Sequence, residues 1–385
     1  MNGWKLEYGG WDSHEQPLRE TLCTLGNGYF ATRGAAEESS AGDPHYPGTY
    51  LAGGYNRLPT EISGRVIENE DLVNWPNWLC LSFRPEGGEW LDVSSTGLLE
   101  FRQELDLKRG VLERRLRLKD GEGRITSLVS RRIVHMRHPH LAAIECTVTA
   151  ENWSGRLEIR SALDGNVINA GVPRYRGLSS RHLEFLESGE LDDDTVRVVV
   201  RTTQSRITMA QAARTRVFED DEEALTKRTL NLDGGWIDHT LTVDCGLGRP
   251  LRVEKVVAIH TSRDSAISEP GLASQLATER AGDFASLLES HEREWQDLWH
   301  RCDIQIAGDP ESQLALRLHI FHLLQTVSRH TTDLDVGVPA RGLHGEAYRG
   351  HIFWDELYIF PYLNTSCPEI TRSLLLYRYR RLPEA

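Results

Sequence analysis

Apolar and polar residues alternate along much of the chain between about residue 75 and residue 262. Val196, Val198 and Val200 form one apolar set, and Arg197 and Arg201 belong to the opposite face. A repeat of two positions is the pattern of a strand with one buried face. The same repeat, or a short β-branched and apolar run between turn residues, recurs at 79–83, 125–136, 141–149, 157–163 and 253–259. Many short strands without intervening helices predict a large antiparallel β-sandwich rather than a parallel α/β sheet.

Helical spacing replaces this alternation after Ser262. Apolar residues then recur every three or four positions from Leu272 to Trp299, which predicts one connecting helix. His291, Trp295 and Trp299 are four residues apart and therefore share a face. The simplest interpretation is that these rings pack against two domains.

A second helix is predicted to begin at Asp309-Pro310. Asp309 suits the N-cap position and Pro310 suits the first helical position. Its buried face is expected to consist of Leu314, Leu318, Phe321, Leu324 and Val327.

A loop rich in glycine and polar residues follows, from about residue 331 to residue 349. A third helical region is expected from Trp354 to about Arg380, interrupted near Pro361 and Pro368. The chain therefore divides into a sandwich domain at 1–265, a helical linker at 266–306, and the beginning of a helical domain at 307–385. Two helical regions do not easily close a core of their own, so we expect apolar stripes such as Leu318, Phe321 and Leu324 to lack neighbours.

The composition excludes several classes of protein. The formal net charge is −13, which argues against a nucleic-acid or anionic-membrane surface, because such binding needs basic patches. No run approaches the roughly 20 apolar residues of a membrane span, and the first residues show no secretory signal. We expect a cytoplasmic protein. Six cysteines occur without close spacing, which predicts buried thiols rather than a zinc site.

The densest candidate for a functional site lies between Val338 and Tyr358. Trp354 can stack on the apolar face of a sugar ring, and Asp355 can accept hydrogen bonds from two sugar hydroxyls. Glu356 projects about 100° away from Asp355 on a helix, so one carboxylate can face the ligand while the other braces it. A first helical turn also favours acids for dipole reasons alone.

The residues before Trp354 add polar and aromatic groups. Arg341 and Arg349 either brace carboxylates or bind an anion, and His344 and His351 either bind a ligand or belong to an ordinary loop. Gly342, Gly345 and Gly350 are expected to adopt backbone conformations that other residues avoid. Ten tryptophans in the chain are mostly expected in the core, with some available to carbohydrate.

A second cluster lies near the N-terminus, at 24–34 and 45–56. Its Gly-Asn-Gly is a turn signal. Its density of aromatic and amide side chains favours a loop that covers a ligand.

Four segments, Leu25–Gly34, Gly48–Tyr55, the Trp295/Trp299 helix and Gly350–Glu356, occur together in an order that resembles glycoside hydrolase family 65. Most of these proteins are phosphorylases of α-glucosidic disaccharides such as maltose, trehalose and kojibiose. The resemblance implies a galactose-mutarotase-like β-sandwich, a helical linker, an (α/α)6 barrel and a small C-terminal β domain, with a homodimer possible in the full-length form.

The resemblance also implies an inverting reaction. One glutamic acid protonates the departing oxygen, and inorganic phosphate, the co-substrate, attacks the anomeric carbon without a further cofactor. Trp354 and Asp355 match the pair that holds the glucosyl unit. The expected substrate-binding set is Arg349, His351, Phe353, Trp354, Asp355 and Glu356.

The sequence departs from the family at its general acid. The Asp-Glu-Tyr-His-Glu stretch that carries the acid does not occur in these 385 residues, and the phosphate ligands of the family also come from later segments. No catalytic residue is assigned here. We expect an incomplete and inactive portion of a phosphorylase. The alternatives are an α-glucoside hydrolase on the same scaffold and a non-catalytic carbohydrate-binding protein.

Overall fold

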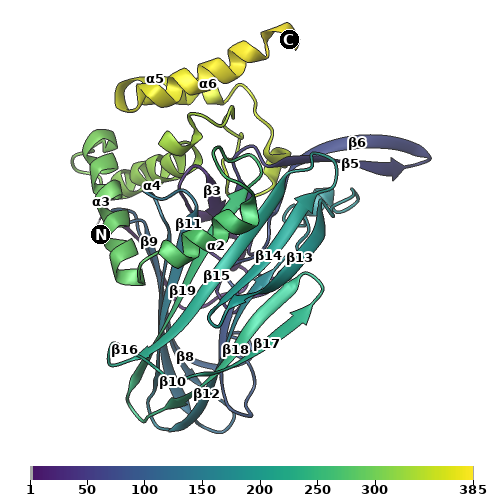
Figure 1. Cartoon of the computed structure of the whole chain (residues 1–385). Helices are drawn as coiled ribbons and strands as arrows, with labels where there is room; N and C mark the ends of the chain where they lie inside the picture. The colour runs from purple at the N-terminus through teal and green to yellow at the C-terminus, as the bar shows by residue number, and fades with distance from the viewer. Residues whose placement is uncertain (1–2, 385) are drawn as a thin grey trace.

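The computed structural model describes residues 3–384. Its strands form a tall body, and most of its helices gather at one end of that body (Figure 1). Every strand pairing between named strands in the described part of the chain is antiparallel. The predicted antiparallel sandwich with helices after it is therefore confirmed.

One layer of the sandwich is a ten-stranded sheet. Its order is β1 (Lys5–Gly9), β8 (Gly97–Asp106), β9 (Val111–Lys119), β10 (Ile125–Val134), β11 (Leu141–Ala150), β19 (Pro250–Thr261), β15 (Thr208–Glu219), β14 (Thr195–Thr202) and β13 (Leu183–Asp192), with β16 (Glu222–Glu223) paired to β15. Val196, Val198 and Val200 of β14 are buried, as their alternation predicts.

The facing layer has four strands. Its order is β17 (Lys227–Asp233), β18 (Trp236–Cys245), β12 (Gly155–Asp164) and β7 (Leu81–Pro85). Leu157 and Ile159 of β12 share one apolar core with Ile144 and Val257 of the larger sheet. This core continues to Phe321 near the helical end of the molecule, so the sandwich and the helices are packed together.

Elements before residue 75 were not predicted from the sequence. Besides β1, they comprise α1 (Gln16–Leu22), a small sheet of β2 (Leu25–Gly26), β3 (Phe30–Thr32) and β4 (Thr49–Leu51), and the hairpin of β5 (Tyr55–Ile62) and β6 (Arg65–Leu72). The hairpin projects sideways from the body (Figure 1). Phe30 and Thr49 are fully buried, so most of the N-terminal cluster is core, and the expectation of a covering loop is wrong for these strands.

The linker consists of two helices, so the prediction of one connecting helix is wrong. α2 (Pro270–Arg280) packs against β15 and β19, and α3 (Phe284–Cys302) follows it. Ala281 is extended, and Asp283 caps α3 by accepting a hydrogen bond from Ser286 N. After the break, α3 also packs on the sheet through Phe284, Leu287 and Leu288.

The ring ladder of α3 packs as expected. The Trp295 and Trp299 rings stack with their centroids 5.8 Å apart, and Trp295 stacks on Phe321 at 4.6 Å. His291 accepts a hydrogen bond from Met136 N and its other ring nitrogen lies 3.1 Å from the Gly110 carbonyl. The helix therefore joins the sandwich to the helix that follows.

That next helix is α4 (Pro310–Thr326), and Asp309 caps it by accepting from Glu311 N and Ser312 N. Its predicted apolar face is only partly correct. Phe321 and Leu324 are buried, whereas Leu314 and Leu318 are half-buried. The prediction that Phe321 and Leu324 lack neighbours is therefore wrong, since α3 covers this face of α4.

The last helices are α5 (Glu356–Ser366) and α6 (Pro368–Arg380), and they form the outermost layer of the helical end (Figure 1). Pro361 lies inside α5 and does not interrupt it, whereas the predicted break near Pro368 is present. Short 3-10 turns complete the elements: η1 (Pro173–Tyr175), η2 (Arg329–Thr331), η3 (Ala347–Gly350) and η4 (Leu382–Glu384).

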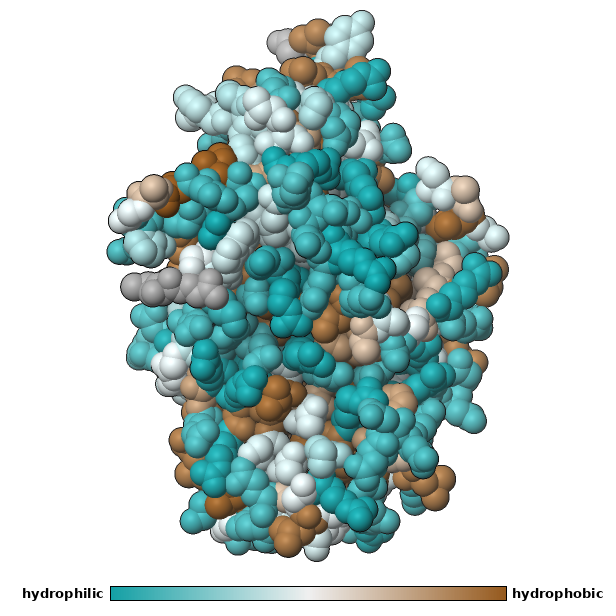
Figure 2. Space-filling view, turned by 90° about the vertical axis from the view of Figure 1, so that its left-hand side faces the viewer, coloured by the Kyte–Doolittle hydropathy of each residue, from teal (hydrophilic) through white to brown (hydrophobic). Residues whose placement is uncertain are grey.

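The helical end of the molecule projects as a narrow knob above a broad and mostly hydrophilic face (Figure 2). Exposed large apolar residues gather on this end. They are Trp354, Leu357, Tyr358, Leu375, Tyr379 and Leu382. No helix within residues 3–384 combines the length and the apolar character needed to cross a membrane.

The six cysteines are free thiols, and all except the half-buried Cys80 are buried. Cys302 at the end of α3 and Cys367 between α5 and α6 lie close together, with their Sγ atoms 3.8 Å apart. This approach could not be predicted from the sequence, because the two residues are distant in the chain.

Candidate functional site

Trp354 and Asp355 lie together at a surface hollow of about 490 Å³. Its lining comprises Ala340, Arg341, Tyr348, Phe353, Trp354 and Asp355. Trp354 is 65% exposed, whereas the other nine tryptophans are buried or half-buried. Its ring meets Tyr358 edge-on, with centroids 5.5 Å apart. An exposed indole beside a carboxylate gives this hollow the two groups that a sugar ring requires.

The Asp355 carboxylate is available to a ligand. The residue stands immediately before α5 and is exposed. Its side chain makes no capping hydrogen bond to the first turn of that helix. The exposed backbone N–H groups and the helix dipole also favour polar partners at this position.

Glu356 has the opposite environment. It is buried, and its carboxylate receives the Arg378 guanidinium at 2.6 Å and a hydrogen bond from Val338 N at 3.2 Å. It is not part of the lining of the hollow. The two adjacent carboxylates diverge, and Glu356 braces the loop against α6.

Arg349 and His351 point to the β5–β6 hairpin rather than to the hollow of Trp354. Arg349 donates to Asn69 Oδ1 at 2.7 Å, and His351 Nε2 lies 2.8 Å from the Glu70 carbonyl. Of these preceding residues in the expected set, only Phe353 lines the hollow. The structure therefore brings Phe353, Trp354 and Asp355 together and separates Arg349, His351 and Glu356 from them.

The loop before Trp354 has an unusual backbone. Gly342 and Gly350 have positive φ angles of 61° and 69°, as expected. Gly345 does not, so the prediction is wrong there. Tyr348 and Arg349 have φ angles of 54° and 57°, which L residues adopt only at a cost. Two consecutive strained residues thus precede Trp354 and Asp355.

A larger hollow of about 820 Å³ adjoins this loop. Arg341 lines both hollows, and the larger one also receives Arg176 from the sandwich. His322 and His344 meet there with ring nitrogens 2.6 Å apart. Burial lowers the pKa of His344 to about 4, so this pair is neutral near pH 7.

Glu346, which the sequence did not single out, is buried at the edge of this larger hollow. It lies 2.5 Å from Tyr46 Oη and 3.2 Å from Tyr50 Oη, and Gly171 N donates to it. Tyr46 has one proton, and the Ile168 carbonyl also lies within reach of its hydroxyl, at 2.9 Å. Tyr46 Oη already accepts hydrogen bonds from Ala170 N and Asn74 Nδ2, so its proton is available to the Glu346 carboxylate. Burial nevertheless raises the pKa of Glu346 to about 7.

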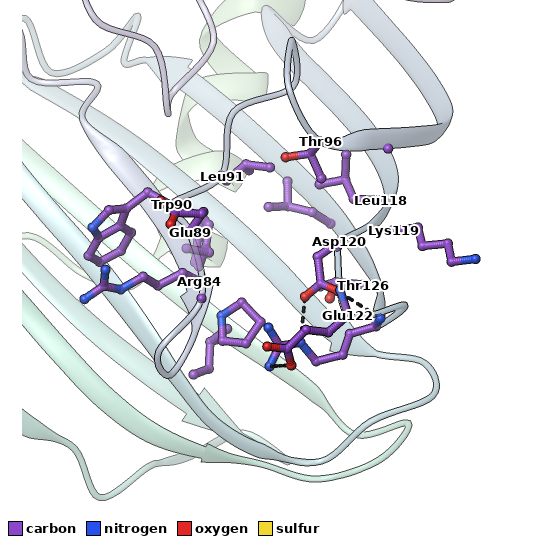
Figure 3. A pocket seen from close by; sticks show the side chains of 18 of the residues that line it. Arg84, Glu89, Trp90, Leu91, Thr96, Leu118, Lys119, Asp120, Glu122 and Thr126 are labelled. Atoms are coloured by element: carbon purple, nitrogen blue, oxygen red, sulfur yellow. Dashed lines mark hydrogen bonds and ion pairs between the residues drawn. The ribbon is translucent and has the colours of Figure 1, made fainter.

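A third hollow, of about 720 Å³, lies at the end of the sandwich away from the helices (Figure 3). Its floor includes Leu118, which belongs to the core between the sheets. On its rim, Arg124 pairs with Asp120 at 2.6 Å and with Glu122 at 3.1 Å. The Trp90 ring of this hollow is already in contact with the guanidinium groups of Arg84 and Arg160, so it is a weaker candidate for a sugar than the hollow at Trp354. No group of three or more potential metal ligands is clustered within residues 3–384.

Two family models match the chain. Residues 6–298 match the glycosyl hydrolase family 65 N-terminal domain, and residues 317–385 match the family 65 central catalytic domain. An uncharacterized glycosyl hydrolase of Mycobacterium tuberculosis is 46% identical over 99% of this chain and 29% of its own length. A kojibiose phosphorylase of Thermoanaerobacter brockii is 32% identical over 99% of this chain and 48% of its own.

A solved structure has the same fold. It is a putative kojibiose phosphorylase from the human microbiome, with a TM-score of 0.86 and 21% sequence identity over 100% of this chain and 49% of that one. The chain thus spans about half the length of the phosphorylases that it matches.

Proposed function

Because the chain belongs to glycoside hydrolase family 65, we propose that it serves the inverting phosphorolysis of an α-glucosidic disaccharide to β-glucose 1-phosphate and a free sugar. Relatives named as kojibiose and maltose phosphorylases support this activity class. The substrates are then the disaccharide and inorganic phosphate.

Within this reaction, Trp354 and Asp355 hold the glucosyl unit. The observation that carries this assignment is the pairing of the exposed Trp354 ring with an uncapped carboxylate at one hollow. The indole face packs against the apolar face of the sugar, and the carboxylate accepts hydrogen bonds from two adjacent hydroxyls. A site of this kind positions a substrate without itself breaking a bond.

The 385 residues by themselves are proposed to bind a glucosyl unit without cleaving its bond. Glu356 is unsuited to act as general acid, because Arg378 holds its carboxylate in a buried ion pair. Glu346 is enclosed by two tyrosines at the other hollow. The family's acid-bearing stretch does not occur in the sequence.

The binding assignment is tested by calorimetric titration of the chain with glucose and methyl α-glucoside. We expect Trp354→Ala and Asp355→Asn to weaken binding at least tenfold, since each removes one face of the site. Tyr379→Ala is the matched control, because Tyr379 is an exposed aromatic residue on α6 that does not line the hollow. Equal affinity in wild type, Trp354→Ala and Asp355→Asn contradicts the assignment.

A hydrolase is the second candidate, because the relative with 46% identity is named a glycosyl hydrolase. The chain is incubated with maltose, trehalose or kojibiose, with and without phosphate, and glucose and glucose 1-phosphate are measured separately. Turnover that requires phosphate and yields glucose 1-phosphate contradicts the binding-only role of these residues but supports the phosphorylase class. Release of glucose alone, independent of phosphate, favours the hydrolase.

A further inference from the structure

We propose that Cys302 and Cys367 are a site of oxidative modification, at which a peroxide oxidises Cys302 and Cys367 then closes a disulfide. We call these two residues the thiol pair. The disulfide joins the end of the linker helix α3 to the junction of α5 and α6. This site is separate from the hollow at Trp354, so the proposal does not depend on the proposed function.

The thiol pair lies where helices end. Cys302 is the last residue of α3, and Cys367 stands between the last residue of α5 and the first residue of α6. The two Sγ atoms are 3.8 Å apart. A disulfide requires about 2.0 Å. Because neither cysteine is inside a helix, small movements of both side chains and of the backbone at Cys367 can close this gap without breaking helical hydrogen bonds.

Packing between α3, α5 and α6 holds the two thiols together. Tyr362 Oη on α5 donates a hydrogen bond to the Cys302 carbonyl at 2.6 Å. Leu363 and Ile370 are buried in the same apolar core as the thiol pair. The two cysteines are 65 positions apart in the sequence, so folding has already closed the long loop that a disulfide between them requires.

The two thiols differ in acidity. The hydrogen bond from the Cys367 thiol lowers the pKa of Cys302, and Tyr362 on α5 and the Arg301 cation on α3 act in the same direction, against burial and Glu369 on α6. The same hydrogen bond raises the pKa of Cys367. Because the thiolate is the reactive form of cysteine, Cys302 is the attacking group and Cys367 the resolving one.

The remaining cysteines lack this activation. Burial raises the pKa of each of them, namely Cys23, Cys80, Cys146 and Cys245. Oxidation is therefore expected to be selective for the thiol pair.

The oxidation consists of two steps, with hydrogen peroxide as the oxidant. The Cys302 thiolate attacks one peroxide oxygen, the O–O bond breaks, and the departing hydroxide takes up a proton to become water. Cys302 is then a sulfenic acid. The Cys367 sulfur attacks the Cys302 sulfur, the S–O bond breaks, and the hydroxide leaves with the Cys367 proton as a second water. Two electrons have passed from the thiol pair to the peroxide.

The oxidant reaches the thiol pair through the outer layer of the helical end. Cys302 and Cys367 are each 1% exposed. Pro368 and Glu369, which directly follow Cys367, are exposed, and α5 and α6 form the outermost layer (Figure 1). Hydrogen peroxide is little larger than water, so a local opening of this layer admits it.

The test is peroxide treatment of the reduced 385-residue chain without denaturant, followed by denaturation, thiol blocking and peptide mass spectrometry. We expect the number of free thiols to fall from six to four, with a linked Cys302–Cys367 peptide in a chain that remains monomeric on a non-reducing gel. A dithiol reductant is expected to restore all six. Cys146→Ala removes a buried thiol of β11, and this control is expected to form the same linked peptide.

Two variants separate the roles of the two sulfurs. In Cys367→Ala we expect dimedone, a reagent for sulfenic acids, to label Cys302. In Cys302→Ala we expect no label on Cys367. An ordinary thiol reacts roughly 80-fold faster at pH 8 than at pH 6, and we expect a smaller ratio for Cys302, because its lowered pKa leaves more thiolate at pH 6.

The disulfide is also expected to raise the urea midpoint of the wild type, because it constrains the unfolded chain. Cys302→Ala is expected to show no such rise after peroxide. If Cys302 and Cys367 both remain free thiols after peroxide, or if the linked peptides join other cysteines or separate chains, the proposal is wrong. Labelling of Cys367 in Cys302→Ala, without labelling of Cys302 in Cys367→Ala, overturns the assigned roles.

Discussion

Two adjacent carboxylates at the candidate site, those of Asp355 and Glu356, have different surroundings and therefore different roles. Glu356 is buried against Arg378, whereas Asp355, one position earlier, is exposed beside Trp354. One helical step of about 100° accounts for this divergence. The sequence predicted that one acid faces the ligand and one braces it, and the resemblance to the family pointed to Asp355. The ion pair that occupies Glu356 is a tertiary contact and could not be predicted.

Glu346 makes the stability of the protein depend on pH. Its pKa is raised to about 7 by burial, so the folded state holds this proton more tightly than the unfolded chain does. The stabilisation is complete at low pH and is lost as the pH rises through about 7. Between pH 4.5 and pH 8 we expect this group to lower the free energy of unfolding by roughly 3 kcal/mol.

Glu346→Gln removes this titration and keeps the size of the side chain. In urea denaturation at pH 4.5 and pH 8, we expect a smaller difference between the two pH values for the variant than for the wild type. An identical difference in both proteins shows that Glu346 does not titrate as described.

Gly350 and Gly345 form a matched pair for the loop before Trp354. At Gly350 the φ angle is 69°, and an added Cβ lies 2.4 Å from Leu72 Cβ, so we expect Gly350→Ala to destabilise the fold by about 2 kcal/mol or more. At Gly345 the nearest atom to an added Cβ is 3.6 Å away. We expect Gly345→Ala to change the free energy of unfolding by less than about 0.5 kcal/mol. Denaturation of both variants checks this contrast, and equal losses contradict it.

At the scale of secondary-structure elements, strands with one buried face could be predicted from the sequence, whereas exposed strands could not. β12 and β14 have one buried face, so their alternation was visible in the sequence. β6 is exposed along most of its length, with Arg65–Glu68 all exposed. No alternation marks this part of the strand, because the outer end of the hairpin, at 61–68, has solvent on both faces. The division of the linker into α2 and α3 was missed because the apolar spacing continues across Gly282 and Asp283.

The α3 ladder packs between the sandwich and α4. Trp295 is fully buried between Trp299 and Phe321. We expect Trp295→Ala to lower the free energy of unfolding by about 3–5 kcal/mol through lost burial and a residual cavity. Trp153→Ala is the control, because Trp153 is half-buried in the sandwich, and we expect a clearly smaller loss. Denaturation monitored by circular dichroism measures both, and equal losses argue against this role of the ladder.

At the scale of the whole molecule, apolar exposure is concentrated on α5 and α6 rather than on α4. Phe321 and Leu324, which were expected to lack neighbours, are covered by α3. Leu357 and Tyr358 on α5 and Leu375 on α6 are exposed instead. The sequence identified which helices follow the linker, but the face that each one buries depends on partners far away in the chain.

This exposed surface predicts the solution behaviour of the 385-residue chain. Contiguous apolar patches promote association, so we expect the chain to bind a hydrophobic dye and to self-associate as its concentration rises. The double substitution Leu357→Glu and Leu375→Glu is expected to reduce dye binding and association. Light scattering and dye fluorescence measure both effects. A wild-type chain that stays monomeric and binds no dye contradicts the prediction.

The position of β19 has a consequence for the order in which the protein is made. This strand is the last of the sandwich in sequence, yet it pairs with β11 on one side and β15 on the other. Until β19 has left the ribosome, the two parts of the ten-stranded sheet are joined only by the chain between them, and the edges of β11 and β15 that β19 will cover are open. Open edges pair readily with other chains, and such distant pairings form slowly. We therefore expect these two edges to be the part of the nascent sandwich most prone to aggregation until its central strand arrives.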